Sequence, residues 1–556
     1  MDIRQTYLRM LAEDVPQNLE RFDDATGRFL TGGGWAVTNQ DIVYPLALLY
    51  TTESPVNPYH RDERLLPYIM RGGDAWRDFQ NPDGSVEFIK VDGSTWGPTF
   101  MPWSMYHWLE TYALMYDELD PGRRRRWEEG LRLAYTGIAA LLERSGVHNI
   151  PTWHAQALYR AGQIFERPEW MKGGRHMIYR TVEEQTPQGY WREHLGPTTS
   201  YNLVYVHALG LYHGHSGDDG VLDSIQRATD FHIRYTYPDG RPVETIDGRV
   251  KYHDHVSATG LPAFSLSPRG RRYVRFLVEH MLAERAERGE PEISYIKTGG
   301  SIKIAAAQYG LVPHLASAYV HHQEGPEEAI LQDRADYSVH DPGQALIRRG
   351  DGWFYCLSGI VTPPADNRWG MDRQAFISVW NQGPRLIVGG GNSKDQPEWS
   401  NFVHPGQDGP LYLPTAARLE PGDQGDAVIL TYGERDCTIG ATIVDPGHLA
   451  VRLAGPAGAT GQLLLKLKPR QALATGAGAS YVLDGEGLEL TSEAAGGWIG
   501  QDGWRVGLPG DSKVTWPVYP FNPYAADGAA PLQEAVAVLS VSLESSPVVV
   551  NFEVEA

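Results

Sequence analysis

The chain has 556 residues, of which 42% are hydrophobic and 21% charged, and its formal net charge is −20. This composition indicates a globular protein of two or three domains, and the negative charge argues against nucleic-acid binding, which needs a basic face. No run of about 18 apolar residues predicts a membrane span, and no signal peptide is visible, so we expect a cytoplasmic protein, or a secreted one if a signal was removed.

Up to about residue 322, apolar residues recur every three or four positions, which predicts helices separated by polar, glycine- and proline-containing loops. Amphipathic segments such as 122–144 alternate with nearly all-apolar ones such as 201–213. This alternation favours two concentric layers of helix pairs, an (α/α) toroid. The predicted helices span residues 3–22, 41–52, 61–79, 102–119, 122–144, 151–165, 168–185, 200–215, 220–237, 268–288 and 299–322.

From about residue 335 the segments become short, β-branched and punctuated by turns, which is typical of an antiparallel β-sandwich. The predicted fold class is therefore α+β multidomain. We expect a catalytic toroid over 1–325, a linker over 326–340 and a β-sandwich over 341–556. The predicted strand regions are 344–361, 373–391, 427–435, 437–445, 448–456, 462–469, 481–492, 503–510, 535–543 and 547–556.

Two predicted inner helices begin with polar side chains that can transfer protons or bind anions. Asn149 is a natural N-cap, and His154 falls in the first turn of the same helix. The next inner helix follows a cap at Thr199 or Ser200 and carries Tyr201 in its first turn. In a toroid these two helices are neighbours that point the same way, so both N-termini open onto one rim.

Each of these residues also has a purely structural explanation: a cap, a packed histidine and a core tyrosine. Their coincidence at one rim favours a functional site. Helix N-termini attract anions, and a chain with 16 Trp and 29 Tyr has many rings able to stack on sugars. A carboxylate-bearing sugar would suit such a rim.

The chain resembles the toroid polysaccharide lyases, the heparinase II/III-like and alginate lyase group. The resemblance lies in "HNIPTWHAQALYRAGQIFERPEW", "GYWREHLGPTTSYNLVYVHALGL", "GLPAFSLSPRGRRYVRFL", "GDGWFYCLSG" and "NRWGMDRQAFISVWNQGPRLIVGGG". The order of a helical toroid and an antiparallel β domain extends it over nearly the whole chain. It implies a carbon–oxygen lyase that cleaves a glycosidic bond at a uronic acid, such as glucuronate, by β-elimination, and whose product is an unsaturated uronate.

By the same resemblance, Asn149 would bind the substrate carboxylate. Tyr201 would serve as the acid, or as both base and acid in a syn elimination, and Arg192 would lower the pKa of the Tyr201 phenol. A histidine would be the base in an anti elimination. The residues expected to bind substrate in the approach to this helix are Tyr190, Trp191, Arg192 and Glu193.

The sequence departs from the family in the crossing loop of the β domain, where many of these lyases carry a histidine. Arg368, Trp369 and Arg373 stand in this loop, and we expect them to bind the charged substrate. Candidate bases that replace the missing histidine are His154, His253 and His255. The last two alternate around Asp254 as metal ligands could, but two ligands are too few to predict a metal, and we predict no cofactor.

A glycoside hydrolase on the same toroid is the main alternative, because that chemistry needs only two suitable carboxylates. The available carboxylates are Asp92, Glu110, Glu193, Glu244 and Asp254. A non-catalytic carbohydrate-binding scaffold is a third option. The expected partner is an anionic oligo- or polysaccharide, cleaved from a chain end, and the sequence leaves open whether the protein is a homo-oligomer.

Overall fold

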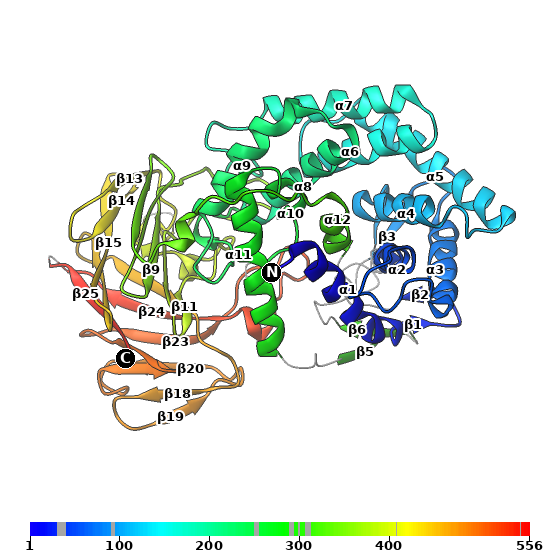
Figure 1. Cartoon of the computed structure of the whole chain (residues 1–556). Helices are drawn as coiled ribbons and strands as arrows, with labels where there is room; N and C mark the ends of the chain where they lie inside the picture. Colours follow the sequence, from blue (N-terminus) through cyan, green and yellow to red (C-terminus); the bar gives the residue numbers. More distant parts are fainter. Residues whose placement is uncertain are drawn as a thin grey trace. The chain divides into compact units, whose positions relative to one another are not determined.

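The computed structural model describes residues 1–29, 40–89, 95–249, 255–288, 294–298, 301–305, 313–406, 409–544 and 546–555. The chain forms two compact units (Figure 1). The helical unit comprises Met1–Gly189, Tyr201–Thr229 and Ser257–Glu328, and the sheet unit comprises Tyr190–Ser200, Asp230–Val256 and Ala329–Ala556. The predicted fold class is confirmed. The two short segments that the sheet unit takes from the first half of the chain were not expected from the sequence.

In the described residues, the helical unit contains helices and three β-hairpins. Its helices are α1 (Ile3–Leu19), α2 (Val43–Thr51), α3 (Leu66–Phe79), α4 (Pro102–Met115), α5 (Pro121–Leu142), α6 (Asn149–Ile164), α7 (Pro168–Glu183), α8 (Thr199–Ser216), α9 (Leu222–Arg234), α10 (Leu261–Phe264), α11 (Pro268–Arg288) and α12 (Pro313–His321). Its strands are β1 (Phe22–Asp23), β2 (Arg28–Phe29), β3 (Val86–Ile89), β4 (Thr95–Thr99), β5 (Ser294–Thr298) and β6 (Ser301–Ala305).

Helix packing within this unit follows the predicted two layers. Helix α2 packs on α4 and α4 on α6 in the inner layer, while α3 packs on α5 and α5 on α7 outside them (Figure 1). Helix α12 packs on α1 and α2, which brings the last helix back to the first and closes the ring. In the described part of the chain, no helix is long and apolar enough to cross a bilayer.

The prediction of one helix over 299–322 is wrong for its first part. Residues Ser301–Ala305 form strand β6, which pairs antiparallel with β5, and helix α12 begins only at Pro313. The sequence of β6 alternates isoleucine with polar or small residues, a period that fits a strand better than a helix.

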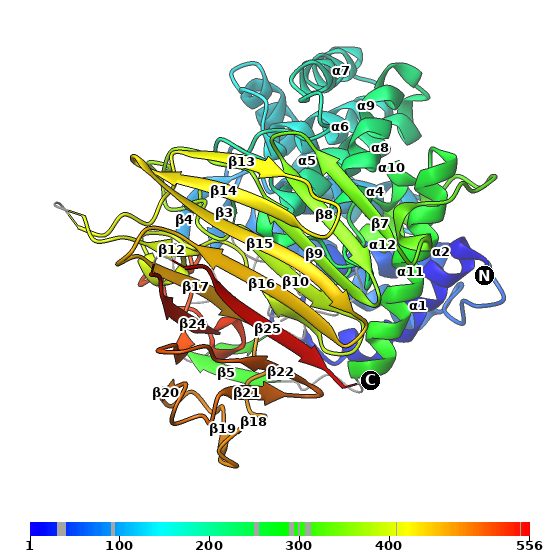
Figure 2. The ribbon, with the colours of Figure 1, turned by 90° about the vertical axis from the view of Figure 1, so that its left-hand side faces the viewer.

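The sheet unit is built from two antiparallel sheets. One follows the order β20-β23-β24-β17-β11-β10-β9-β8-β7, with β12 beside β17, and the other follows β13-β14-β15-β16-β25-β22-β21-β18-β19. Figure 2 faces the second sheet, where β13 to β16 and β25 lie side by side.

The strands of the first sheet are β7 (Tyr337–Asp341), β8 (Ala345–Gly350), β9 (Trp353–Ser358), β10 (Ile377–Asn381), β11 (Arg385–Val388), β12 (Phe402–Val403), β17 (Thr460–Leu465), β20 (Leu488–Thr491), β23 (Lys513–Val518) and β24 (Val536–Ser542). Those of the second are β13 (Ala416–Glu420), β14 (Asp426–Tyr432), β15 (Arg435–Asp445), β16 (His448–Ala454), β18 (Ala472–Thr475), β19 (Ser480–Val482), β21 (Trp498–Gln501), β22 (Trp504–Gly507) and β25 (Val548–Val554). Strand β7 begins within the stretch predicted as a linker, 326–340, and ends one residue after it.

One apolar core joins the two sheets. Strands β14 and β16 bury alternate residues, as strands with one solvated face do. Their inward side chains, such as Val428 and Leu453, pack with Tyr355 and Leu463 of the first sheet. This core gives the sheet unit the two-layer architecture expected from the sequence.

Candidate functional site

The inner helices α4, α6 and α8 run side by side in the same direction. Trp103 in α4 packs edge-on against Trp153 in α6, with ring centroids 5.3 Å apart, and Trp153 stacks on His207 of α8 at 5.2 Å. Further along, Tyr159 of α6 contacts Tyr212 of α8 at 5.1 Å. The sequence spacing between partners stays nearly constant along the helices, so the helices are parallel and their N-termini share one end of the helical unit.

This register places Tyr201, in the first turn of α8, at the level of the residues that begin α6. Tyr201 is half-buried, and Asn149, the first residue of α6, is buried with 8% of its surface exposed. A phenol and an amide therefore lie at the same end of two neighbouring parallel helices. The positive ends of both helix dipoles lie there too.

Asn149 is not the N-cap that we predicted. His148 occupies that position in extended conformation (φ −157°, ψ 177°), and its carbonyl accepts the first helical hydrogen bond, from Thr152 N at 3.1 Å. The helix begins one residue earlier than predicted, because His148 and not Asn149 is the last residue with extended dihedral angles. Asn149 is thus the first residue of the helix itself.

The start of α8 is also capped differently from the prediction. Thr199 and Ser200 both lie within the helix, and the carboxylate of Asp247 caps it instead. Asp247 Oδ2 accepts from Thr199 N at 2.8 Å, Thr199 Oγ1 at 2.9 Å and Ser200 N at 3.3 Å. A buried carboxylate at a helix N-terminus satisfies peptide N–H groups and is favoured by the dipole. The Asp247 cap therefore fixes where α8 begins, and with it the position of Tyr201 in the first turn.

His154 lies in the helix interior with 0% of its surface exposed, and burial lowers the pKa of its imidazole to about 3. A fully buried imidazole has no contact with a sugar at the surface, and its lowered pKa makes it a weak base, so this position favours a packing role. Three further histidines line the interior around Trp153: His207 and His314 are 4.6 Å apart between ring centroids, and His107 is 6.1 Å from His314.

The predicted binding segment before α8 is mostly buried in the sheet unit. Trp191 is 1% exposed, and Tyr190 is a core residue that packs on Phe231 at 5.5 Å. Glu193 is buried as well. Among the four residues that we predicted here, only Arg192 is exposed to solvent.

The arginines of the crossing loop have different environments. Arg373 is buried and donates hydrogen bonds to the backbone carbonyls of Ile246 and, at 2.8 Å, Pro197. Burial lowers the pKa of its guanidinium to about 10. These bonds tie two segments to the first sheet and favour a structural role. Arg368 is exposed and lies over the ring of its half-buried neighbour Trp369, 5.6 Å from the centroid.

A cluster that the sequence did not reveal lies beside this loop in the sheet unit. Arg249 Nη1 is 3.1 Å from His194 Nε2, and Arg249 Nη2 donates to Tyr524 Oη at 3.2 Å. The same guanidinium lies over Trp369 at 5.3 Å. Partial burial and the Arg249 charge lower the pKa of His194. Arg249 is 55 residues from His194 and 275 residues from Tyr524 in the sequence, so no local pattern could predict the cluster. The one local feature at the cluster is the positive φ of His194 and Leu195 (49° and 75°).

Of the alternative bases, His253 lies outside the described residues, and His255 is half-buried in the sheet unit. Among the described residues, no group of three or more His, Cys, Asp or Glu side chains is arranged to hold a metal ion.

A scan against protein-family models gives no match, and a search of the curated proteins gives none either. Solved structures similar to this chain include a heparinase III (13% identity, TM-score 0.47, 93% of this chain and 77% of that one). Others are heparan sulfate lyase HepC from Pedobacter heparinus (12%, 0.43, 94% and 76%) and a chondroitin AC lyase from Streptomyces coelicolor A3 (12%, 0.48, 99% and 79%). These similar structures are toroid-type polysaccharide lyases, the group that the sequence resembles. Likenesses this distant do not bear on activity.

Proposed function

We propose that this protein is a lyase that cleaves a glycosidic bond at a uronic acid by β-elimination, acting from the end of an oligosaccharide chain. One observation carries the proposal: Tyr201 lies level with the start of α6, at the end that the two parallel helices α6 and α8 share. There a proton-transferring phenol, the Asn149 amide and two helix N-termini act on one region of the helical unit.

In this mechanism the Asn149 amide and the helix N-terminus hold the uronate carboxylate and stabilise the negative charge that develops on it. This acidifies the C5 proton. The Tyr201 phenolate takes that proton, a C4–C5 double bond forms and the C4–O4 bond breaks. The phenol of Tyr201 then gives the proton to the departing O4, so one residue serves as base and acid in a syn elimination.

The burial of His154 supports Tyr201 as the base, because an interior imidazole has no route to the C5 proton. His255 stays the candidate base for an anti elimination. In the sheet unit, Arg368 offers an exposed guanidinium, a group that suits an anionic sugar.

The carboxylates proposed for a hydrolase are less well placed. Glu193 is buried, Glu110 is held by Arg160 at 2.7 Å, and Glu244 accepts from Tyr237 Oη at 2.8 Å in the core. The other two, Asp92 and Asp254, lie outside the described residues. Glycoside hydrolysis needs two carboxyl groups that reach the sugar, so this burial supports elimination over hydrolysis.

A panel of uronate oligosaccharides tests the proposal. It should include alginate, glycosaminoglycan and rhamnose–glucuronate linkages, and each reaction is followed by near-ultraviolet absorbance and by reducing ends. The unsaturated product of an elimination absorbs, whereas a hydrolysis product does not. We expect absorbance and reducing ends to rise together on at least one glycan; reducing ends without absorbance would rule out the elimination.

A further inference from the structure

The hairpin between α3 and α4 carries an exposed pair of stacked aromatic rings. Phe88 of β3 and Trp96 of β4 lie with ring centroids 5.0 Å apart and planes 7° from parallel. Trp96 has 48% of its surface exposed, and Phe88 is half-buried beneath it. A tryptophan that exposes so much apolar surface on a soluble unit is a feature that needs a reason.

The root of this hairpin is fixed to helix α5. Gln80 Nε2 donates to the carbonyls of Gly130 at 2.9 Å and Gly84 at 3.2 Å. Gly84 has φ +86°, and a Cβ there would meet the Ala134 backbone nitrogen at 2.6 Å, so the two backbones touch. The ring of Phe100, just after β4, packs on Gly137 of the same helix. The aromatic pair therefore stands on an anchored support.

The hairpin lies at the end of the helical unit where the site begins. Trp103 of α4 pairs with Trp153 of α6, and Glu110 pairs with Arg160 at the same sequence spacing. The two helices are therefore in register, and their N-termini lie at the same end. Strand β4 ends at Thr99, three residues before α4 begins at Pro102, so the hairpin leads into this shared end.

We propose that Trp96, backed by Phe88, is a stacking subsite for a pyranose ring of the glycan chain, outside the bond that is cleaved. The proposal rests on the proposed function and adds a substrate class to it: chains long enough to reach from the uronate site to the hairpin. A flat ring pair matches the C–H face of a sugar. Stacking is also suited to a protein of net charge −20, because an uncharged contact holds an anionic chain that the overall field repels.

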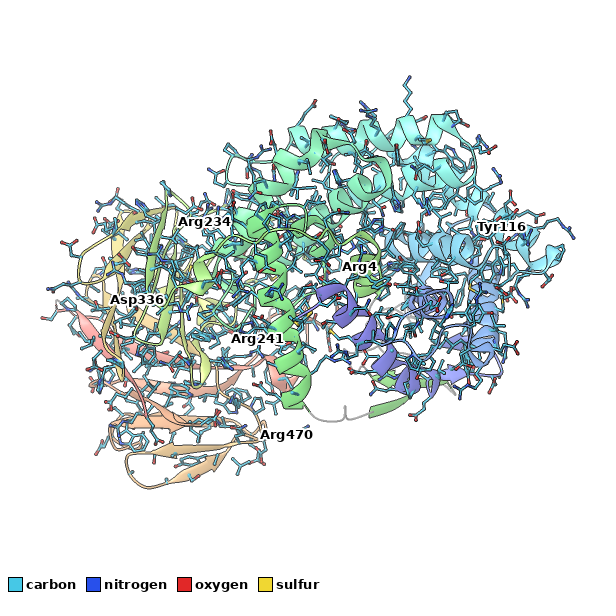
Figure 3. All side chains as sticks on the ribbon, viewed as in Figure 1. Arg4, Tyr116, Arg234, Arg241, Asp336 and Arg470 are labelled. Atoms are coloured by element: carbon cyan, nitrogen blue, oxygen red, sulfur yellow. The ribbon has the colours of Figure 1, made fainter. Side chains whose placement is uncertain are left out.

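Binding in a catalytically silenced background tests this subsite separately from turnover. In the Tyr201→Phe protein, affinities for tetrasaccharides and octasaccharides of heparosan, chondroitin and alginate are measured by calorimetry, with and without Trp96→Ala. The matched control is Tyr116→Ala, since Tyr116 is 43% exposed and follows the opposite, C-terminal end of α4 (labelled in Figure 3).

We expect Trp96→Ala to weaken octasaccharide binding about threefold to tenfold, the range of one aromatic contact, and to leave tetrasaccharide binding and the thermal midpoint unchanged. Tyr116→Ala should change neither affinity. The subsite would be overturned by an equal loss of affinity for both chain lengths or by no loss of affinity. It would also be overturned if the protein with Trp96 intact bound none of the glycans. A change of oligomeric state on gel filtration with unchanged glycan affinity would assign the rings to a protein interface instead.

The two proposals fail separately. If octasaccharide binding depends on Trp96 but no glycan yields an unsaturated product with Tyr201 present, the elimination is wrong and the subsite stands. If product forms and Trp96→Ala does not change kcat/KM on long chains, the elimination stands and the subsite is wrong.

Discussion

The interior of the helical ring and the core between the two sheets bury different kinds of side chain. The cluster between the two sheets consists of apolar side chains drawn from both sheets, and buried polar groups such as Asp426 and His404 lie elsewhere in the same unit. The ring interior contains histidines in edge-to-face contact with one another and a Glu110–Arg160 ion pair, whose carboxylate lies 3.9 Å from His215 Nε2. An apolar core stabilises a fold at any pH, whereas a buried titratable group stabilises it only in one protonation state. Burial lowers the pKa of four histidines of the helical unit to about 3, and that of one histidine of the sheet unit, His232. The helical unit should therefore be the more pH-sensitive of the two.

The largest effect expected from this difference is acid destabilisation of the helical unit. Burial lowers the pKa of His154, His215, His314 and His321 to about 3. The unfolded chain, with imidazoles near 6.5, binds more protons than the folded chain between those values, so stability is lost as the pH falls. Between pH 7 and 5 each histidine should cost about 2 kcal/mol.

Hydrogen exchange at these two pH values, corrected for intrinsic rates, measures this effect. Peptides from α4 to α8 should lose protection before peptides from β14 to β17. His314→Gln should move the acid midpoint to lower pH. Earlier loss of protection in the sheets would contradict the comparison.

The second effect concerns activity alone. Replacing Tyr201 by Phe should lower kcat by about a hundredfold to ten-thousandfold, the usual contribution of acid–base catalysis, without moving the thermal midpoint. Tyr205→Phe, one turn further along α8 and buried, is the control and should keep its activity. Full activity in the Tyr201 variant would remove this residue from the mechanism.

The third prediction tests whether the stability contributed by the sheet core is independent of pH. Leu449 of β16 is fully buried in the apolar core, so Leu449→Ala should lower the free energy of unfolding by about 2–5 kcal/mol. Chemical denaturation should show the same loss at pH 7 and pH 5, because no titrating group is involved. Val444→Ala, at a position 61% exposed, should cost little. If the free energy lost in Leu449→Ala depended on pH, the distinction between the sheet core and the ring interior would be wrong.

The smallest expected effect lies at the start of α8. Asp247→Ala removes the acceptor of the Thr199 and Ser200 N–H groups and should cost about 2 kcal/mol. Asp247→Asn keeps one acceptor oxygen and should cost less. Thermal melts compare the two; an equal cost would show that the carboxylate charge is not what caps the helix.

Local patterns were enough to predict most of the fold. The period of apolar residues predicts α1 to α9 and α11, and short β-branched runs predict the two sheets. Tyr201 in a first helical turn follows from the turn-forming residues before it. The hairpin of β5 and β6 was missed because its glycine pair and alternating strand were merged into a longer helical pattern.

The details of the site depend on residues distant in sequence, which local patterns do not bring together. The cap on α8 comes from Asp247, almost fifty residues later, and the cluster around Arg249 includes Tyr524 from the other end of the chain. His154 looks accessible in a first turn, yet its face of α6 turns inward. Polar residue type alone does not distinguish a rim from an interior.

The most direct test of the central claim is the fate of water in the reaction. The protein is incubated with a uronate oligosaccharide that it cleaves, in water labelled with heavy oxygen, and the products are analysed by mass spectrometry and absorbance. β-Elimination at the Tyr201 site predicts an unsaturated product without the label. A saturated product that carries heavy oxygen at the cleaved bond would contradict it and identify a hydrolase.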